Sequence, residues 1–311
     1  MKPRSPIWIP WRGFQVLDPS AILCLDYETN DFTFYIPSIM KPLQRIAVVG
    51  NATKDGAGDI ADRLETLAKA EGLEVELTMT FPPPDDLLAE VDACFVVGGD
   101  GTLLNMMKQA VRHDVPIAGV RHGQLGFLAT FSPEEMEHTM PGIFRGGYEV
   151  RRRSMLSYAM AGGEESFALN DLVVKSGSKG RLARFSVHAE SELVADYACD
   201  GIVFSTPTGS TAYNLAAGGP IVHPGSEVMM MTPISAHTLT SRSVVFPAGI
   251  SLSVDSKNNP DEPLVSADGQ PAFASSVEFP VQVSVSVHSF PLLEESGHSH
   301  FRVLRNKMKW G

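Results

Sequence analysis

The sequence has no excess of basic side chains, few cysteines and no long apolar run. Its 25 lysines and arginines face 36 acidic residues, giving a net charge of −11 at pH 7, which disfavours a nucleic-acid binder because such proteins usually present a basic face. Cys24, Cys94 and Cys199 lack metal-ligand spacing, and this indicates reduced thiols of a cytoplasmic protein. No run approaches the roughly 20 apolar residues that span a bilayer. We therefore expect a soluble cytoplasmic protein without nucleic-acid or membrane partners.

The first 39 residues differ in composition from the rest of the chain. They contain Trp8 and Trp11, two of the three tryptophans, with several prolines and no helical period. Acidic residues in this segment disfavour an organelle transit peptide, and "FTFYIP" is compatible with a short strand. We expect an N-terminal extension over residues 1–39, either an appendage or sequence upstream of a start at Met40.

From residue 40, apolar runs alternate with helical patterns. Short continuous apolar runs, typical of buried parallel strands, are "RIAVVGN", "LEVELTM", "DACFVVGGD" and "VPIAGVRHG". Apolar residues at helical spacing occur between them, in "GDIADRLETLAKAEG" and "GTLLNMMKQAVRHD". This alternation predicts a Rossmann-like parallel α/β domain over residues 40–146.

After residue 147 the segments become short, alternating and rich in β-branched residues. Examples are "SFALNDLVV", "ARFSVHAE" and "PVQVSVSVH", and they predict a β-rich, sandwich-like domain over 147–288. The end of the chain, "HFRVLRNKMKWG", is basic and compatible with a helix. We expect residues 289–311 to pack back on the α/β domain.

A glycine loop follows the third predicted strand, in "CFVVGGDGTLL". A helix that starts at GGDGT would present free N–H groups with no Cβ atoms in the way, which suits a di- or triphosphate. The chain lacks both the Walker-A lysine motif and the third glycine of a dinucleotide fingerprint. Asp100 would be a base, a metal holder or only a helix cap, and the loop alone leaves these alternatives open.

A second polar stretch lies between two apolar strands, in "DGIVFSTPTGSTAYNLAAGGPIVHP" at residues 200–224. Thr208, Ser210 and Thr211 offer short donors, and Tyr213 offers a flat face with a polar tip. A turn needs about four residues, far fewer than this stretch contains. The pattern therefore predicts a binding loop for a polar, partly aromatic ligand.

Taken in order, these motifs resemble the NAD kinase family from about Met40 to the C-terminus. They are GGDGT, "GQLGFL", "LND", "DGIVFSTPTGSTAYNLAAGGP", "PISAHTLTSR" and "SADGQ". The stretch "STPTGSTAYNLAAGGP" is highly specific, whereas diacylglycerol-type lipid kinases and phosphofructokinases carry loops similar to GGDGT. The resemblance implies a site between the two domains and transfer of the terminal phosphoryl group of ATP, or of polyphosphate, to the adenosine ribose 2′-hydroxyl of NAD. It also implies Mg²⁺ or another divalent cation with the donor, and a homodimer or homotetramer.

The resemblance implies roles for the residues that match its motifs. Asp100 would accept the proton of the ribose hydroxyl, and the phosphate loop would be Gly98, Gly99, Gly101 and Thr102. The implied NAD contacts are Asp100, Gly101, Phe127, Asn170, Asp171, Arg181, Ala198, Asp200, Thr211, Ala212, Tyr213, Asn214, Leu215, Ala216 and Gln270. No protein residue is predicted to hold a metal by itself.

Three positions depart from the family pattern or vary within it. Arg121 stands where an asparagine is expected; it would either hold phosphate bidentately or, as we prefer, pair with a surface acid. Ala198 occupies a position of variable type, which leaves the donor preference open. Arg181 would reach the ligand or belong to a solvated basic loop, and we favour the loop.

Histidines and competing functions complete the predictions. His122, His223 and His237 lie near the motifs without metal-ligand spacing, so we expect structural hydrogen bonds from them. Two other functions compete with an NAD kinase. A lipid kinase that shares only GGDGT would need an apolar acceptor cleft, and the hydroxyl-rich second loop disfavours such a cleft. A non-catalytic dinucleotide-binding protein would not need Asp100.

Overall fold

The computed structural model of the chain describes two short strands near the N-terminus and most of the chain from residue 40 onward. The described residues are 22–25, 32–35, 40–177, 183–238, 240–256, 263–273 and 276–310. Strands β1 (Ile22–Leu25) and β2 (Phe32–Tyr35) form a two-stranded antiparallel sheet of their own. A strand within "FTFYIP" is therefore confirmed. No described helix is long and apolar enough to cross a membrane.

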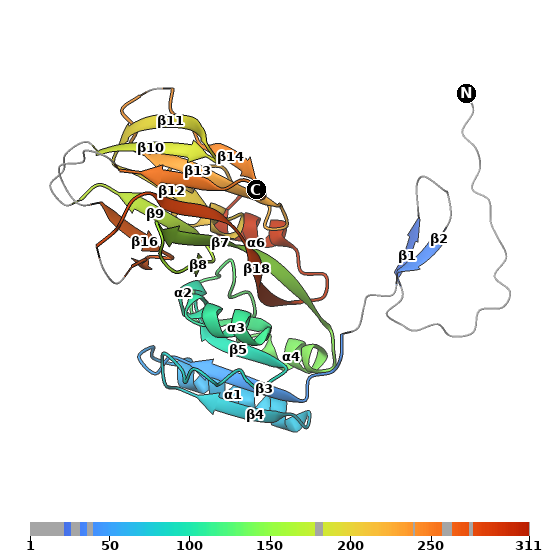
Figure 1. The fold of residues 1–311 in the computed structure, drawn as a ribbon. Coiled ribbons are helices and arrows are strands. Elements are labelled where there is room, and N and C mark those ends of the chain that lie inside the picture. Colours follow the sequence, from blue (N-terminus) through green and yellow to red (C-terminus); the bar gives the residue numbers. More distant parts are fainter. Residues whose placement is uncertain are drawn as a thin grey trace, which may run out of the picture.

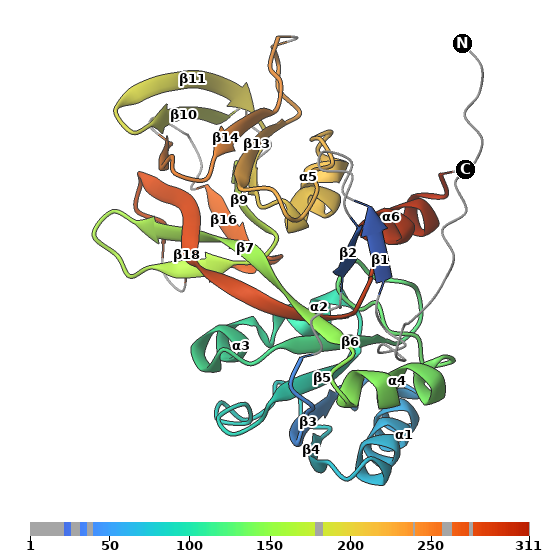
Figure 2. The ribbon, with the colours of Figure 1, turned by 90° about the vertical axis from the view of Figure 1, so that its right-hand side faces the viewer.

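The α/β domain contains four parallel strands in the order β4-β3-β5-β6; Figure 1 labels the first three of them and Figure 2 labels all four. They are β3 (Arg45–Gly50), β4 (Glu74–Thr78), β5 (Ala93–Gly98) and β6 (Ile117–Arg121). Every residue of β5 is buried, as its continuous apolar run predicts. The chain runs outward from β3 to β4 and then returns to form β5, so the strand order reverses between β3 and β5.

Helices cover both faces of this sheet (Figure 2). One core cluster packs α1 (Ala57–Ala70) and α4 (Met136–Phe144) on the first face, and another packs α2 (Asp100–Leu104) and α3 (Met107–His113) on the second. The predicted Rossmann-like domain is confirmed.

The single helix predicted over "GTLLNMMKQAVRHD" is divided into α2 and α3. The side chain of Asn105 donates to the Gly101 carbonyl, at 2.8 Å, and the Met106 N–H bonds the Leu103 carbonyl three residues back. These tighter local bonds compete with the regular helical ladder. The break leaves the first turn, with the glycine loop, as a separate short element.

Two antiparallel sheets form the β-rich domain, and their inner faces share one apolar core. One sheet contains β9 (Asp171–Lys175), β12 (Gly201–Ser205), β13 (Val228–Ile234), β14 (Val244–Pro247), β16 (Leu264–Ala267) and β17 (Gln270–Pro271). The other contains β7 (Tyr148–Met160), β8 (Ser166–Ala168), β10 (Ala183–Ala189), β11 (Glu192–Cys199), β15 (Leu252–Asp255) and β18 (Val281–Glu295). The predicted sandwich is confirmed.

Strand β18 joins the two domains. It pairs with β7 along its length and, through Leu292, lies parallel to β6, so the parallel sheet continues into one sheet of the sandwich. Residue 288, which we predicted as a domain boundary, falls within β18 beside a bulge between Val285 and Ser289. After β18 comes α6 (His300–Met308), whose Lys307 Nζ donates to the Leu125 carbonyl, at 2.7 Å, in the loop after β6.

Candidate active site

The carboxyl ends of β3, β5 and β6 meet at one edge of the parallel sheet. Ligands of open α/β sheets bind at this edge, at the point where the strand order reverses. Here that point lies between β3 and β5, and the loops that follow these strands are Asn51–Gly56 and Gly99 with the start of α2. We call the space between these two loops the phosphate crevice.

Asp100 binds three consecutive backbone N–H groups of the loop after β6. Its Oδ2 accepts from Phe127, at 2.8 Å, and its Oδ1 accepts from Leu128 and Ala129, both at 3.0 Å. Hydrogen bonds to an ionised carboxylate are stronger than those between neutral groups. The arrangement, which we call the Asp100 clamp, therefore fixes the "LGF" segment beside the glycine loop.

The possibility that Asp100 is only a helix cap is wrong. The N-cap of α2 is Gly99, which has no side chain to cap with, and Asp100 is the first helical residue. Gly126 completes the clamp, because a Cβ there would overlap the Asp100 carboxylate. Gly126 is therefore required by this close approach and not by a special backbone angle.

Lys54 is a residue of the crevice that sequence reasoning missed. Its Nζ lies 3.2 Å from Thr102 Oγ1 and so connects the loop after β3 with the glycine loop after β5. Gly98 makes this possible, since a Cβ there would collide with the Thr102 side chain. Within the described part of the chain no carboxylate pairs with Lys54. A cation without an acidic partner therefore lies at the crevice.

Asp268, from the "SADGQ" motif, repeats the pattern of Asp100 in the β-rich domain. Its Oδ2 accepts from the N–H of Leu169, at 2.8 Å, while Oδ1 accepts from Asn170 and Asp171, at 2.7 and 3.2 Å. This second clamp fixes the "LND" segment. Burial nevertheless keeps the pKa of the Asp268 carboxyl above its ordinary value.

The "STPTG" loop is attached to the same "LND" segment. Thr206 donates from its backbone to the Asn170 carbonyl, at 2.9 Å, and from its hydroxyl to the Leu169 carbonyl, at 2.6 Å. At Gly209 a Cβ would overlap the Asn170 carbonyl, so only glycine allows the contact. These bonds bring residues of two separate motifs to one surface.

Ser210 does not offer a donor to a ligand, contrary to our prediction for the hydroxyls of this loop. It is fully buried, donates to the Pro207 carbonyl at 2.6 Å, lies 3.1 Å from the Val222 carbonyl, and accepts from the Val222 N–H. Thr211 donates to the Thr208 carbonyl, at 3.3 Å. The Thr208 hydroxyl has no partner among the described residues. Most of these hydroxyls shape the loop.

A cavity of about 420 Å³ lies where these segments meet, lined by Asn170, Asp171, Lys175, Ala212 and Tyr213 among others. Lys175, which sequence reasoning also missed, places its Nζ 4.5 Å from the centre of the Tyr213 ring, within cation–π range. Burial first, and then the charge of Asp268, raise the pKa of the Asp171 carboxyl to about 6. The cavity thus offers an aromatic face, a cation and a carboxyl group that titrates near neutrality.

A second cavity of about 390 Å³ adjoins the first through Asp268. Gly101 and Lys108 line it from the α/β domain, and Gln270 lines it from β17. The two cavities therefore bring the glycine loop together with six of the predicted contacts, namely Gly101, Asn170, Asp171, Ala212, Tyr213 and Gln270.

Other predicted contacts lie elsewhere. Asn214 is fully buried, and its amide bonds Ser210, Pro220 and Thr232. Ala198 lies in β11, Asp200 is the residue between β11 and β12, and neither residue lines either cavity. The remaining ones, which also line neither cavity, are Asp100, Phe127, Thr211 in a short 3-10 helix, and Leu215 and Ala216 in α5 (Tyr213–Ala216). Arg181 lies outside the described residues, and the NAD contacts of all these residues stay predictions.

Arg121 pairs with a surface acid, as we preferred. Its guanidinium lies 2.7 Å from Glu134 and also donates to Ser132. Arg121 is therefore occupied within the protein rather than free for phosphate.

Among the histidines, His122 and His237 donate backbone N–H bonds to the carbonyls of Gly98 and Ala198.

Comparisons with known proteins agree with these motifs. The family model of the ATP-NAD kinase N-terminal domain matches residues 85–148, and that of the C-terminal domain matches residues 169–294. The NAD kinase of Pseudomonas putida (strain W619) is 33% identical over 288 residues, which cover 88% of this chain and 97% of that protein. The NAD kinase of Gemmatimonas aurantiaca is 38% identical over 226 residues, 71% of this chain and 78% of that protein.

Solved structures show the same architecture. An NAD kinase from Archaeoglobus fulgidus in complex with ATP has a TM-score of 0.71 and 29% identity, covering 86% of this chain and 99% of that one. A yeast NADH kinase complexed with NADH has a TM-score of 0.77 at 20% identity, covering 95% of this chain and 93% of that one. The second likeness concerns the fold alone.

Proposed function

The chain belongs to the NAD kinase family, and from that premise we propose how its own residues carry out the reaction. The terminal phosphoryl group of ATP is transferred to the adenosine ribose 2′-hydroxyl of NAD, giving NADP and ADP. The observation that carries the proposal is the placement of Asp100 at the end of β5, with Gly101 lining a cavity that Gln270 closes from the other domain.

Asp100 serves as the general base. As the 2′-oxygen attacks the terminal phosphorus, the bond from phosphorus to the ADP oxygen breaks and the hydroxyl proton moves to the Asp100 carboxylate. Oδ2 accepts only one of the three clamp hydrogen bonds, so it retains a lone pair for that proton. The clamp orients this oxygen, since Oδ1 is held by two N–H groups.

The donor phosphates occupy the phosphate crevice. Gly99 and Gly101 have no Cβ to screen their backbone N–H groups, and the space beside both residues is open: apart from the adjacent residues and the helix's own backbone, no atom lies within 4 Å of either Cβ position. Lys54, already bonded to Thr102, supplies the positive charge. Phosphoryl transfer depends mainly on such positioning and charge stabilisation.

A divalent cation accompanies the donor. The described residues contain no group of three or more acidic, histidine or cysteine side chains arranged for a metal. This composition fits a Mg²⁺ ion that arrives on the phosphates, since Mg²⁺ is commonly held by one or two carboxylates and substrate oxygens. When bound, the ion would neutralise part of the charge on the donor phosphates, and the Asp100 carboxylate is a group that could help to hold it.

NAD occupies the two adjoining cavities. Tyr213 offers its ring to a flat group of the dinucleotide, and Asn170, Asp171 and Gln270 offer hydrogen-bonding groups around it. The other predicted contacts with NAD remain part of the proposal, namely Phe127, Arg181, Ala198, Asp200, Thr211, Ala212 and the residues of α5. Clamped backbone at "LND" and "LGF" supports this placement, because both motifs are fixed before a ligand arrives.

We also propose a cytoplasmic homodimer or homotetramer. The proposal rests on the family resemblance. Light scattering of the purified protein gives the mass directly; a monomer at micromolar concentration would contradict the proposal.

A coupled assay tests the reaction. Purified protein is incubated with NAD, Mg²⁺ and either ATP or polyphosphate, and an NADP-specific dehydrogenase reports the product. We expect NADP with ATP, and the polyphosphate arm measures the donor preference that Ala198 leaves open. Absence of NADP with both donors would contradict the proposed function, and phosphorylation of diacylglycerol in its place would favour a lipid kinase.

A further inference from the structure

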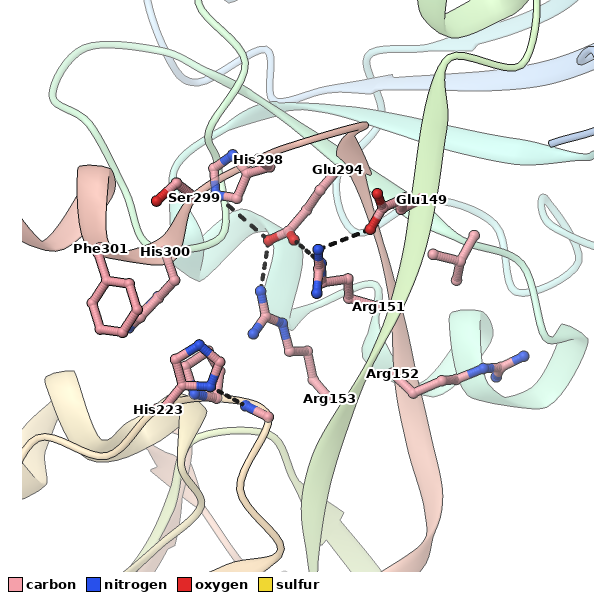
Figure 3. Close-up of a pocket in the computed structure, with 13 residues that line it drawn as sticks. Glu149, Arg151, Arg152, Arg153, His223, Glu294, His298, Ser299, His300 and Phe301 are labelled. Atoms are coloured by element: carbon pink, nitrogen blue, oxygen red, sulfur yellow. Dashed lines mark hydrogen bonds and ion pairs between the residues drawn. The ribbon is translucent and has the colours of Figure 1, made fainter. Parts of the chain in front are cut away.

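A third cavity, of about 510 Å³, is lined by residues to which the reaction above gives no role (Figure 3). Its walls come from β7, the loop that contains His223, the end of β18 and the start of α6. We call it the arginine–histidine cavity, after Arg151, Arg153, His223 and His300.

A buried ion pair forms one wall. The side chains of Arg153 and Glu294 are 7% and 2% exposed, and Arg153 Nη2 lies 2.6 Å from Glu294 Oε1. Arg151 approaches the other oxygen of Glu294 at 3.2 Å and also bonds Glu149. Both acids of this cavity, Glu149 and Glu294, are therefore paired with arginines.

Two buried polar atoms of the cavity have no hydrogen-bond partner. They are Nε of Arg153 and Nε2 of His300, two of the four such side-chain atoms among the described residues. A buried donor without a partner is costly and uncommon. Both residues line the same cavity, although the two atoms themselves have almost no accessible surface, so a ligand with acceptor oxygens would bond them once the side chains turn toward it.

His223 adds a donor. Its Nδ1 accepts the Gly225 N–H, at 3.1 Å, so in the neutral ring the hydrogen is on Nε2. The His223 and His300 rings meet edge to face, with centroids 5.4 Å apart. Burial first, and then the charge of Arg153, lower the pKa of His300 to about 4. The His300 ring is therefore also neutral near pH 7 and has one N–H to donate.

The start of α6 contributes backbone donors. Ser299 caps this helix by accepting from the Arg302 N–H, at 3.4 Å. The N–H groups of His300 and Phe301, in the first turn, have no intrahelical acceptor. The positive end of the helix dipole therefore faces the same cavity as Arg153.

We propose that the arginine–histidine cavity binds a phosphate group, with Arg153, His223 and His300 as its hydrogen-bond donors. Figure 3 shows the Arg153 guanidinium between the Glu294 carboxylate and His223, so a phosphate on the histidine side meets the guanidinium before the acid. The volume and the polar donors match those of ordinary small-ligand sites.

The phosphate has two possible sources, because Phe127 links this cavity to Asp100. The Phe127 N–H donates to Asp100, and its ring centroid lies 6.5 Å from that of His300. The group is either part of a nucleotide that extends from the phosphate crevice or a free phosphate bound independently. Both sources use the same chemistry.

Calorimetric titration of the full-length protein with inorganic phosphate tests the site. We expect saturable binding by the wild type and a loss of at least about tenfold in affinity for His300→Phe and for Arg153→Lys, since each removes a donor. Arg145→Gln is the matched control, because Arg145 pairs with Glu71 and does not line the cavity, and its affinity should stay within about twofold of wild type. Melting curves confirm that each variant is folded, and His300→Phe preserves the ring packing.

No saturable binding by the wild type, or unchanged affinity in both folded variants, would overturn the proposal. A second titration with saturating ATP and Mg²⁺ assigns the source: competition indicates the nucleotide's own phosphate, and independent binding indicates free phosphate. The titrations omit NAD and measure no turnover, so their outcome is separate from that of the kinase assay.

Discussion

At the scale of single residues, the two aspartate clamps distinguish this site. Asp100 and Asp268 each hold three consecutive N–H groups from a segment far along the chain. The sequence shows both residues beside glycines but does not show their partners, because a contact across 27 or 97 residues leaves no local pattern. Lys54 was missed for the same reason, since its partner Thr102 lies on another strand's loop.

Lys54→Met tests the charge in the phosphate crevice. Loss of a charged hydrogen bond to the donor should raise the KM for ATP by about tenfold or more and leave the KM for NAD nearly unchanged. Lys69→Met is the control, because Lys69 pairs with Glu65 on the exposed side of α1. Steady-state kinetics with each substrate varied in turn provides the measurement. Equal KM values for ATP in wild type and Lys54→Met would remove Lys54 from the donor site.

The buried carboxyl of Asp171 predicts a pH dependence of stability. Its pKa is raised from 3.8 to about 6, so the folded protein holds this proton more tightly than the unfolded chain. The stabilising contribution is complete below pH 3.8 and is lost as the pH rises through 6. Asp171→Asn has no such titrating group. Between pH 5 and pH 7 the free energy of unfolding of the variant should therefore rise by about 1–2 kcal/mol relative to that of the wild type.

Urea unfolding at several pH values measures this difference. Asn at position 171 retains an acceptor for the Tyr213 N–H that the carboxyl now binds, so the comparison isolates the charge. Parallel stability curves for the two proteins across this range would contradict the raised pKa.

At the scale of elements, the strands could be predicted from the sequence more completely than the helices and loops that follow them. The parallel strands could be predicted because each is a continuous apolar run, and β5 is buried throughout. The break between α2 and α3 could not, because "LLNMMKQAV" has an uninterrupted helical period while the Asn105 amide bonds Gly101. The polar "STPTG" loop was predicted to bind a ligand, whereas within it Ser210 serves the loop's own structure.

Tyr213→Ala tests the NAD loop. Removal of an aromatic face, worth on the order of 1 kcal/mol, should raise the KM for NAD severalfold, with a smaller effect on ATP. Tyr213→Phe is the control, because it keeps the ring beneath Lys175 and loses only the hydroxyl. Initial rates over a range of NAD concentrations decide the matter, and an equal rise for both substrates would place Tyr213 outside the NAD cavity.

At the scale of the whole molecule, the continuous sheet through β18 couples the two domains that form the site. The N-terminal strands β1 and β2 pair with each other and with no other described strand. A chain that starts at Met40 should therefore fold and keep most of its activity. Melting temperature and turnover of this shortened protein are the measurements; insoluble or inactive protein would show that residues 1–39 are required.

The account depends most on Asp100 as the proton acceptor. Asp100→Asn and Asp268→Asn make the same structural change, because in each clamp the new amide nitrogen replaces an oxygen that accepts an N–H. Both variants should lose similar stability, about 1 kcal/mol for one hydrogen bond. Only Asp100 is assigned a chemical role, so the two variants separate catalysis from architecture.

The decisive measurement is the kcat of both variants at saturating NAD and ATP, with melting curves for each. We predict that Asp100→Asn loses about 10²- to 10⁴-fold, the usual cost of removing a general base, while Asp268→Asn loses less than about tenfold. Equal losses in the two variants, or near-native turnover by folded Asp100→Asn, would contradict the catalytic assignment.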